Sequence, residues 1–250
     1  MGLTLGLDSA LSGLLASQAA LNVVSQNITN VNTPGFTRKL VNLESKQLNN
    51  NGAGVDLTSI SRSVDTGLSA QLNTQSSTMG NLNALQTYYT QIESLFGTVG
   101  SGSSIADQLG TMAAGMQQLA SDNTQAANQT AAVQDTVTVT NALNNLSSSI
   151  QTLRQQADLG VGQGVTQVNQ DLNSLYDLNT KIARNLAIHA DTTNLQDQRD
   201  STLSDLSKYV NVKSYTDSNG ILHVYTQNGT ALLDNQAHPL SHPTSSGLEP

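Results

Sequence analysis

The sequence predicts a mainly α-helical protein: a long-helix antiparallel bundle with an N-terminal assembly helix and the start of a β-rich domain at the C-terminal end. Through the first 209 residues, apolar side chains recur at spacings of three, four and seven. From Val210 the spacing changes to two, with turn residues between the runs. Charged residues are 11% of the chain, against roughly 25% in an average soluble protein. The surface is therefore largely Ser, Thr, Asn and Gln, which favours close packing between subunits.

Composition excludes several classes of function. A net charge of −8 with only ten Lys and Arg residues argues against binding nucleic acid or anionic membranes. No run of 18 apolar residues occurs, so we expect no membrane insertion. The chain has no Cys, which excludes disulfide and thiol chemistry. The N-terminus lacks the basic and apolar regions of a secretory signal peptide, so any export would proceed without a cleaved signal.

The first element is a helix predicted from Asp8, its N-cap, to Asn30, preceded by a frayed arm. Apolar residues recur along it every seven positions, with a second set three positions on. The first set is Leu7, Leu14, Leu21 and Ile28, and the second is Ala10, Ser17, Val24 and Val31. Leu11 and Leu15 widen this stripe, and Ala16, Ala19 and Ala20 would let another backbone approach closely. One slender helix cannot cover such a stripe, so we expect it to pack against a partner.

An Asn-rich stop and a turn follow this helix. The residue before a proline avoids the α region, and Pro34-Gly35 suits the centre of a type II turn. Residues 36–48 are predicted to be extended, and residues 49–54 (NNNGAG) to form a turn or flexible joint.

The middle of the chain is predicted to form an antiparallel helical bundle joined by short polar loops. Ser104 and Asp107 resemble a capping box at the start of one of its helices. The run GVGQG at residues 160–164 is interpreted as a flexible connector between two others. The expected helices cover approximately residues 58–96 (bent at Gly80), 105–121, 139–157, 165–186 and 195–209.

A β-meander is predicted after Val210, with turns at residues 217–220 and 227–229. Because two or three strands are marginal alone, we expect the chain to be a fragment or to be completed by a partner. Its Leu-Glu-Pro end is consistent with an artificial terminus. The expected organisation is an N-terminal segment 1–57, a helical bundle 58–209 and the start of a β-rich outer domain 210–250.

Two motifs carry a resemblance to a known family. The stretch from Ser17 to Arg38 resembles the N-terminal signature of bacterial flagellar axial proteins, the superfamily of rod, hook and hook-associated proteins. Its Thr-Pro-Gly-aromatic-Thr-Arg form is most similar to that of hook-associated proteins at the junction of hook and filament. The stretch from Asn194 to Asp200 (NLQDQRD) resembles a Leu-x-Asp-x-Arg-Asp motif that precedes a strand-rich domain in that family. The matching positions of the first motif are Asn27, Asn30, Asn32, Thr33, Pro34, Gly35 and Phe36.

The resemblance implies a structural subunit that is exported to the extracellular flagellum. It implies a homo-oligomer in a ring or helical array, in contact with hook protein and with neighbouring hook-associated or filament subunits. It also implies an export apparatus and a chaperone as transient partners, and an inner helical layer completed by a C-terminal helix that this sequence lacks. The expected assembly interface comprises Leu7, Leu11, Leu14, Leu21, Val24, Asn27, Ile28, Asn30, Asn32, Pro34, Gly35 and Phe36.

Other interpretations remain open. The Asn cluster is also consistent with an ordinary helix stop and turn. His238 and His242 have one metal-ligand spacing but are better interpreted as loop residues, and no cofactor or metal is expected. The carboxylates of Asp197 and Asp200, with Arg199, are expected to form helix-surface salt bridges or a cap, not a catalytic pair. Alternative functions are a hook or distal-rod subunit, an assembly-associated hydrolase and a helical coiled-coil module.

Overall fold

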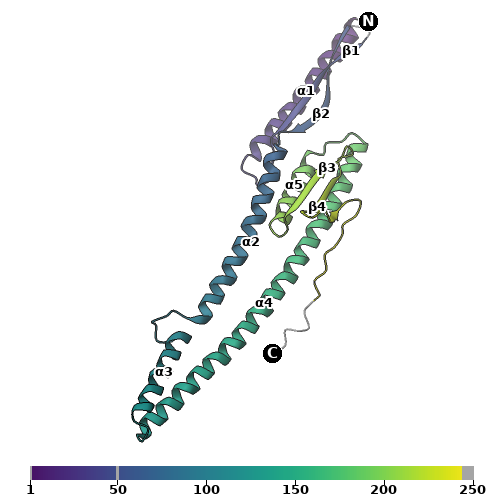
Figure 1. Ribbon diagram of the computed structural model, residues 1–250. Coiled ribbons are helices and arrows are strands. Elements are labelled where there is room, and N and C mark those ends of the chain that lie inside the picture. Colours follow the sequence, from purple (N-terminus) through teal and green to yellow (C-terminus); the bar gives the residue numbers. More distant parts are fainter. Residues whose placement is uncertain (1, 49–50, 244–250) are drawn as a thin grey trace. The chain divides into compact units, whose positions relative to one another are not determined.

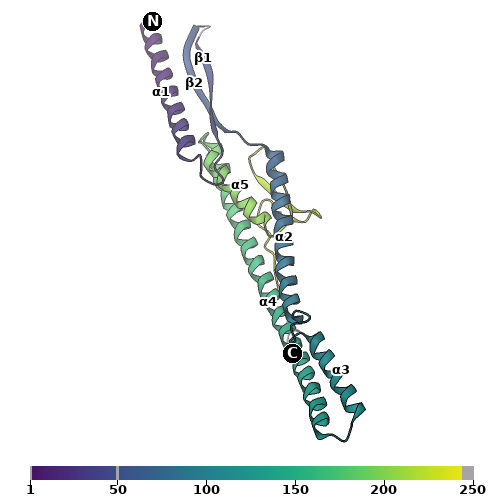
Figure 2. The same cartoon turned by 90° about the vertical axis from the view of Figure 1, so that its left-hand side faces the viewer.

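Figures 1 and 2 show the computed structural model, which describes residues 2–48 and 51–243. The chain divides into two compact units. One unit is Met1–Met79 with Gln167–Leu240, and the other is Gly80–Thr166 with Ser241–Pro250. The protein is mainly α-helical, as predicted. Its elements over the described residues are α1 (Gly2–Thr29), β1 (Lys39–Leu48), β2 (Asn51–Arg62), α2 (Thr66–Phe96), α3 (Ile105–Ser121), α4 (Ala126–Ala187), α5 (Thr193–Ser207), β3 (Val212–Thr216), β4 (Leu222–Thr226) and β5 (Ala231–Leu233).

Helix α1 begins at Gly2, so the expected frayed arm and the Asp8 cap are wrong. Asp8 lies inside the helix. Glycine costs a helix only about 1 kcal/mol relative to alanine, and the leucines between the first glycines continue the apolar pattern. The helical period therefore extends to the start of the chain.

Strands β1 and β2 form an antiparallel hairpin in which Lys39 pairs with Arg62 and Val41 with Ile60. The extended conformation predicted before residue 49 is confirmed from Lys39 onward. The helix expected to start at Thr58 is wrong there, because Thr58 to Arg62 belong to β2. Ile60 fits both a helical and a strand period, and pairing with β1 selects the strand. The expected domain boundary after residue 57 falls inside this strand.

The turn expected at residues 49–54 is also corrected. Residues 49 and 50 lie outside the described residues, and Asn51 to Gly54 are the first residues of β2. The Leu-Glu-Pro end at residues 248–250, interpreted above as an artificial terminus, likewise lies outside them.

Helix α1 packs on the hairpin through small side chains. Ala16, Val23 and Ala53 are each at most 7% exposed. Gly54 has a φ of +105°, and a Cβ there would lie 3.0 Å from the Cα of Ser9. The Val55 N–H donates to the Ser12 hydroxyl at 3.2 Å. Small residues thus allow the close backbone approach expected for α1, and the neighbouring backbone is the chain's own hairpin.

Helix α3 has the predicted bounds, and Ser104 caps it by accepting the Asp107 N–H at 3.0 Å. The Asp107 carboxylate accepts the N–H groups of Gly100 and Gly102 at 2.9–3.1 Å. The bond from Gly100, followed by that from Ser104, lowers the pKa of Asp107. The bond from the Asp107 N–H to Ser104 is therefore the one that the predicted capping box requires of the serine. The Asp107 carboxylate also holds the loop that precedes the helix, through Gly100 and Gly102.

Helix α4 is continuous over 62 residues, so the connector expected at residues 160–164 is wrong. Each glycine costs about 1 kcal/mol in a helix, and no proline or capping residue adds a stop signal in this run. A Cβ at Gly160 would lie 3.3 Å from the Tyr88 hydroxyl of α2. Gly160 is therefore a site of close approach within an unbroken helix. Helix α2 is likewise unbroken through Gly80.

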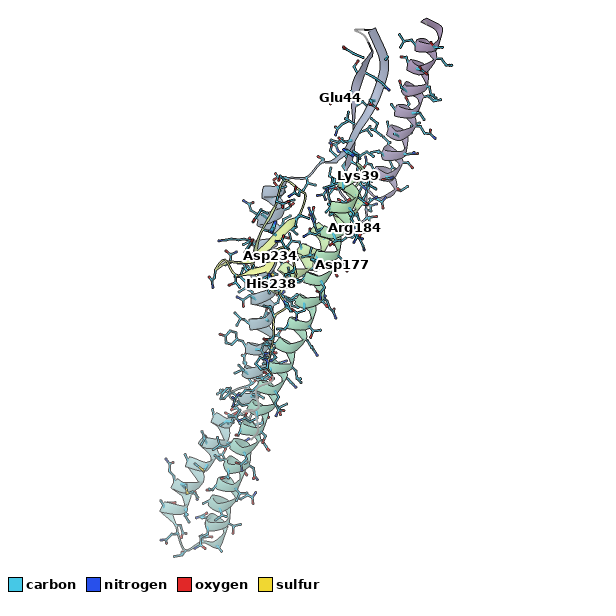
Figure 3. All side chains as sticks on the ribbon, turned by 90° about the vertical axis from the view of Figure 1, so that its right-hand side faces the viewer. Lys39, Glu44, Asp177, Arg184, Asp234 and His238 are labelled. Atoms are coloured by element: carbon cyan, nitrogen blue, oxygen red, sulfur yellow. The ribbon has the colours of Figure 1, made fainter. Side chains whose placement is uncertain are left out.

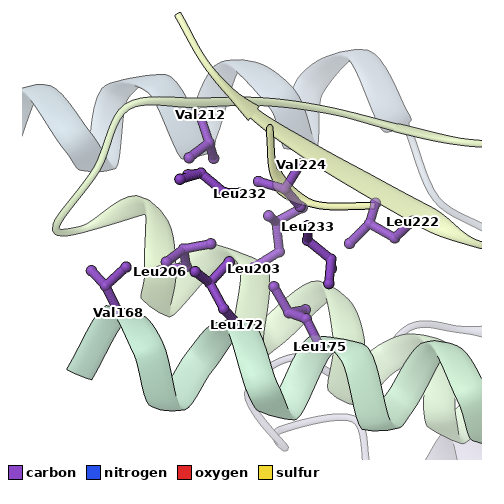
Figure 4. Close-up of a cluster of buried hydrophobic side chains, with 10 residues drawn as sticks. All are labelled: Val168, Leu172, Leu175, Leu203, Leu206, Val212, Leu222, Val224, Leu232 and Leu233. Carbon is purple, nitrogen blue, oxygen red and sulfur yellow. The ribbon is translucent and has the colours of Figure 1, made fainter. Parts of the chain in front are cut away.

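Strands β3, β4 and β5 form the predicted antiparallel meander, in the order β3-β4-β5. Their inner face shares one apolar core with α4 and α5 (Figure 4). The expected domain boundary at residue 210 therefore cuts through one core, because the strands after it pack on α4 and α5 before it. The core residues are Val168, Leu172, Leu175, Leu203, Leu206, Val212, Leu222, Val224, Leu232 and Leu233.

Candidate assembly interface

The apolar stripe of α1 lies on the face that the hairpin leaves uncovered. Leu7 is 71% exposed, Leu21 69% and Ile28 67%. The covered face instead carries Ala16 and Val23. Burying one such large side chain contributes about 1.5–3 kcal/mol, so the stripe is a large reserve of association energy. The exposed members of the predicted interface on this helix are Leu7, Leu11, Leu14, Leu21, Val24 and Ile28.

Asn27 joins the end of α1 to the start of the hairpin. Its side-chain amide donates to the Lys39 carbonyl at 2.9 Å, and its oxygen accepts the Lys39 N–H at 2.9 Å. A primary amide presents one donor and one acceptor side by side, which matches the two backbone groups of one residue. Asn27 therefore fixes the exit of the chain from the helix.

The other asparagines of the motif differ from Asn27. Asn30 donates to the Gln26 carbonyl at 3.0 Å and accepts the Thr33 hydroxyl at 3.2 Å, so it caps its own turn. Asn32 is exposed. Asn30 therefore behaves as expected for an ordinary helix stop and turn. Asn27 differs, because it bonds to the backbone of Lys39, 12 residues further along the chain.

The turn predicted at Pro34-Gly35 is present. Gly35 has a φ of +79°, and the Phe36 N–H donates to the Thr33 carbonyl at 3.2 Å. A Cβ at Gly35 would lie 3.4 Å from the Cβ of Ser201 on α5. The Lys39 ammonium lies 4.8 Å from the centre of the Phe36 ring, within cation–π distance. The turn thus lies directly against α5.

The two motifs found in the sequence meet at Asp197, 160 residues from Thr37 along the chain. The Asp197 carboxylate accepts the Thr37 hydroxyl at 2.5 Å and one Arg62 guanidinium nitrogen at 2.9 Å. The same nitrogen donates to Asp200 at 2.8 Å, and the Arg62 Nε donates to Gln196 at 2.9 Å. We call this cluster the Asp197 junction; it comprises Thr37, Lys39, Arg62, Asn194, Gln196, Asp197 and Asp200.

Lys39 completes the junction from the base of the hairpin, where Figure 3 labels it. It is 2% exposed, donates to the Asn194 side chain, and its ammonium lies 4.0 Å from Asp197. Asp197 is 7% exposed, so the expectation of a helix-surface salt bridge is wrong for it. Two cations and two carboxylates balance in charge, which a largely buried ionic group requires.

A second polar cluster joins α4, α5 and the sheet. The Asn179 amide donates to the Leu222 carbonyl at 2.8 Å, and its oxygen accepts the Leu222 N–H at 3.0 Å. Arg199 donates to the Gly220 carbonyl at 2.7 Å and to the Asn179 oxygen at 3.2 Å. Burial lowers the pKa of Arg199. Arg199 is therefore a buried residue whose hydrogen bonds link α5 to α4 and to the turn before β4. The sequence did not indicate this role.

The two remaining candidate ligands, His238 and His242, each lie beside one aspartate. His238 lies beside Asp234 at 3.0 Å (Figure 3), and His242 lies 3.0 Å from Asp158. Over the residues that the structure describes, no cluster of three potential ligands could hold a metal ion. Within the same residues, no helix combines the length and apolarity needed to span a membrane.

Comparison with known proteins first defines a class. Residues 7–37, which hold the stripe and the turn, match the family described as flagella basal body rod protein. Helix α1 and its Asn-rich stop are thus similar to a family of flagellar proteins. Residues 89–247, more than half of the chain, match the family described as flagellar hook-associated protein FlgK helical domain. The chain belongs to this FlgK family.

Individual relatives agree. The chain is 28% identical to flagellar hook-associated protein 1 of Escherichia coli (strain K12), over 91% of this chain and 42% of the relative. It is 27% identical to flagellar hook-associated protein 1 of Bacillus subtilis (strain 168), over 86% of this chain and 45% of the relative. The solved structure of the flagellar hook junction protein FlgK from Burkholderia pseudomallei aligns with a TM-score of 0.58 and 27% identity, covering 68% of this chain and 30% of that one.

The chain therefore spans less than half the length of the curated relatives it matches. The predicted family is confirmed. Membership implies a location in the flagellum.

Proposed function

We propose that this chain belongs to a structural subunit that joins hook to filament in the bacterial flagellum. Exposed apolar stripes of neighbouring chains would bury one another in a ring or helical array. The observation that carries the proposal is the stripe itself. Its leucines are more than half exposed, although α1 is packed against the hairpin on its other face. A helix so supported presents its apolar side in a defined direction.

The proposed partners follow from the family. They are further copies of the subunit, hook protein, and neighbouring hook-associated or filament subunits. The curated relatives are more than twice as long as the region matched, so a helix from the remainder of the protein is a further candidate to cover part of the stripe. We include export without a cleaved signal, an export apparatus and a chaperone in the proposal, and no catalytic step.

The predicted interface residues contribute in two ways under this proposal. The apolar side chains of α1 supply contact area. The turn residues Asn30, Asn32, Pro34, Gly35 and Phe36 set the path of the chain beside that contact, and Asn27 holds the path to the helix.

The test introduces Leu14→Glu together with Leu21→Glu into the protein that carries this chain, expressed in flagellated cells. The two introduced carboxylates would have to be desolvated when the stripe is buried in the array, which is costly for an unpaired charge. Filaments should therefore fail to attach to hooks, and motility should be lost. Gln26→Glu is the matched control, because Gln26 is exposed on the same helix but lies off the stripe. Normal hooks and filaments with the double variant would contradict the proposal.

A further inference from the structure

The Asp197 junction joins two parts of one compact unit that each have their own packing. We call residues 2–62 the arm; it contains α1 and the hairpin, with Ala16, Val23 and Ala53 buried. We call residues 167–240 the body; it contains the end of α4, α5 and the meander, with its own apolar core (Figure 4). Arm and body both belong to the unit formed by Met1–Met79 and Gln167–Leu240.

The contact between arm and body is polar. Among the described residues, every member of the apolar core cluster belongs to the body. The arm instead contributes Thr37, Lys39 and Arg62, whose side chains bond to α5. Apolar packing is non-directional, whereas hydrogen bonds weaken steeply with angle. The orientation of the arm on the body therefore rests on the directional bonds of the junction.

Asp197 is the centre of these bonds. Lys39 begins β1 and Arg62 ends β2, and the two residues are cross-strand partners. One carboxylate thus contacts both strands at the base of the hairpin. The side chains of Lys39 and Arg62 are 1% and 12% exposed, so neither cation can turn into water without leaving the contact. A tilt of the arm would separate buried opposite charges.

We propose that Asp197 is a positioning residue, a latch that fixes the direction of the arm on the body and so aims the apolar stripe of α1. The latch acts in the isolated chain, before any assembly. It goes beyond the proposed function and holds or fails separately from it.

Distance measurements by electron paramagnetic resonance test the latch, and the absence of native cysteine allows specific labelling. Spin labels at Asn22→Cys on α1 and Lys181→Cys on α4 report the arm-to-body distance, since both positions are exposed. A label pair within the arm, at Asn22→Cys and Glu44→Cys, and a pair within the body, at Lys181→Cys and Ser214→Cys, report the integrity of each part.

The latch predicts a single narrow arm-to-body distance in the otherwise unaltered chain and its loss in Asp197→Ala, while both internal distances stay narrow. Asp205→Ala is the matched control. It removes a carboxylate from the same helix that pairs with Lys208 at 2.6 Å on the exposed surface, and it should leave all three distances unchanged.

A second variant keeps the test decisive if Asp197→Ala disturbs the body. Arg62→Gln removes a cation from the arm side and leaves every residue of the body in place. It should also broaden the arm-to-body distance alone. A narrow arm-to-body distance in Arg62→Gln, or in an Asp197→Ala chain with intact internal distances, would overturn the latch. Loss of filament attachment in the stripe variants tests the proposed function independently of either result.

Discussion

At the scale of single residues, asparagine side chains at three places in the chain hold a distant backbone segment by a pair of hydrogen bonds. Asn27, Asn169 and Asn179 each lie in or at the end of a helix and bond to both backbone groups of one distant residue. The partners are Lys39, Leu240 and Leu222 respectively. Each amide replaces the neighbouring strand that would otherwise satisfy those groups, and it does so without burying a charge.

Asn179 provides the clearest test of this pair of hydrogen bonds, because it is 3% exposed and its partner Leu222 is 4% exposed. Asn179→Leu would leave the Leu222 N–H and C=O groups buried without partners. We expect a loss of about 2–4 kcal/mol in the free energy of unfolding, measured by chemical denaturation. Asn144→Leu, at an exposed position of the same helix, should change it little. A loss below about 1 kcal/mol for Asn179→Leu would show that the two bonds contribute little net stability.

Asp171 makes stability depend on pH. Burial raises the pKa of this carboxyl in the folded chain, with Asp205 adding to the effect against bonds from Gln167 and the charge of Lys208. A raised folded-state pKa means that the neutral form is favoured by folding. Its stabilising contribution is present below the unfolded value of 3.8 and is lost as pH rises through the folded-state pKa.

Asp171→Asn should therefore be more stable than the unaltered chain at neutral pH. The difference should shrink as pH falls through the folded-state pKa toward 3.8, where both side chains become neutral. Paired urea titrations of the two proteins across this range provide the measurement. An advantage that grows toward acid pH would contradict the assigned direction.

At the scale of elements, α1 has two faces with different partners. Small residues face the hairpin, where Gly54 and Ser12 lie close together. Large apolar residues face away from it. The predicted heptad stripe was therefore correct as a pattern, while the hairpin as a partner for the small-residue face could not be predicted, because that contact depends on how β1 and β2 pair.

The Pro34-Gly35 turn sets how α1 is followed by the hairpin. Gly35→Val would force a β-branched residue into a φ of +79° and bring its Cβ close to Ser201. We expect this variant to impair assembly more than it lowers the melting temperature of the isolated protein, because Gly35 is not a member of the apolar core of the body. Filament attachment in cells and thermal melting of the purified chain provide the two measurements. A sharply lowered melting temperature with normal assembly would contradict this assignment.

Elements were predicted best where the spacing of apolar residues fits only a helix or only a strand and where turn or capping residues mark the ends of the element. Helix α3 and the meander have both, and their positions are confirmed. Residues 58–62 fit a helix and a strand equally, and only pairing with β1 decides between them. The glycines of α4 suggested a break, although their cost is small against a helix of 62 residues.

At the scale of the whole molecule, ionic and amide bonds connect segments that are far apart in sequence. Thr37 and Asp197 were each part of a recognised motif, yet nothing in local sequence indicated that they meet. Arg199 was assigned to a helix surface for the same reason, and it is 4% exposed. Burial of charged residues could not be predicted, since it depends on partners supplied by a tertiary contact.

The central claim is that the exposed stripe of α1 becomes an interface on assembly. The most direct measurement places one thiol, Leu21→Cys, in the cysteine-free chain and follows its reaction with a water-soluble maleimide. The thiol should react rapidly in the isolated protein, because Leu21 is 69% exposed there, and should be protected in assembled flagella. Ser214→Cys, an exposed position on β3, reports whether reagent reaches assembled subunits. Equally rapid reaction of Leu21→Cys in the isolated and assembled states, with Ser214→Cys accessible in both, would contradict the claim.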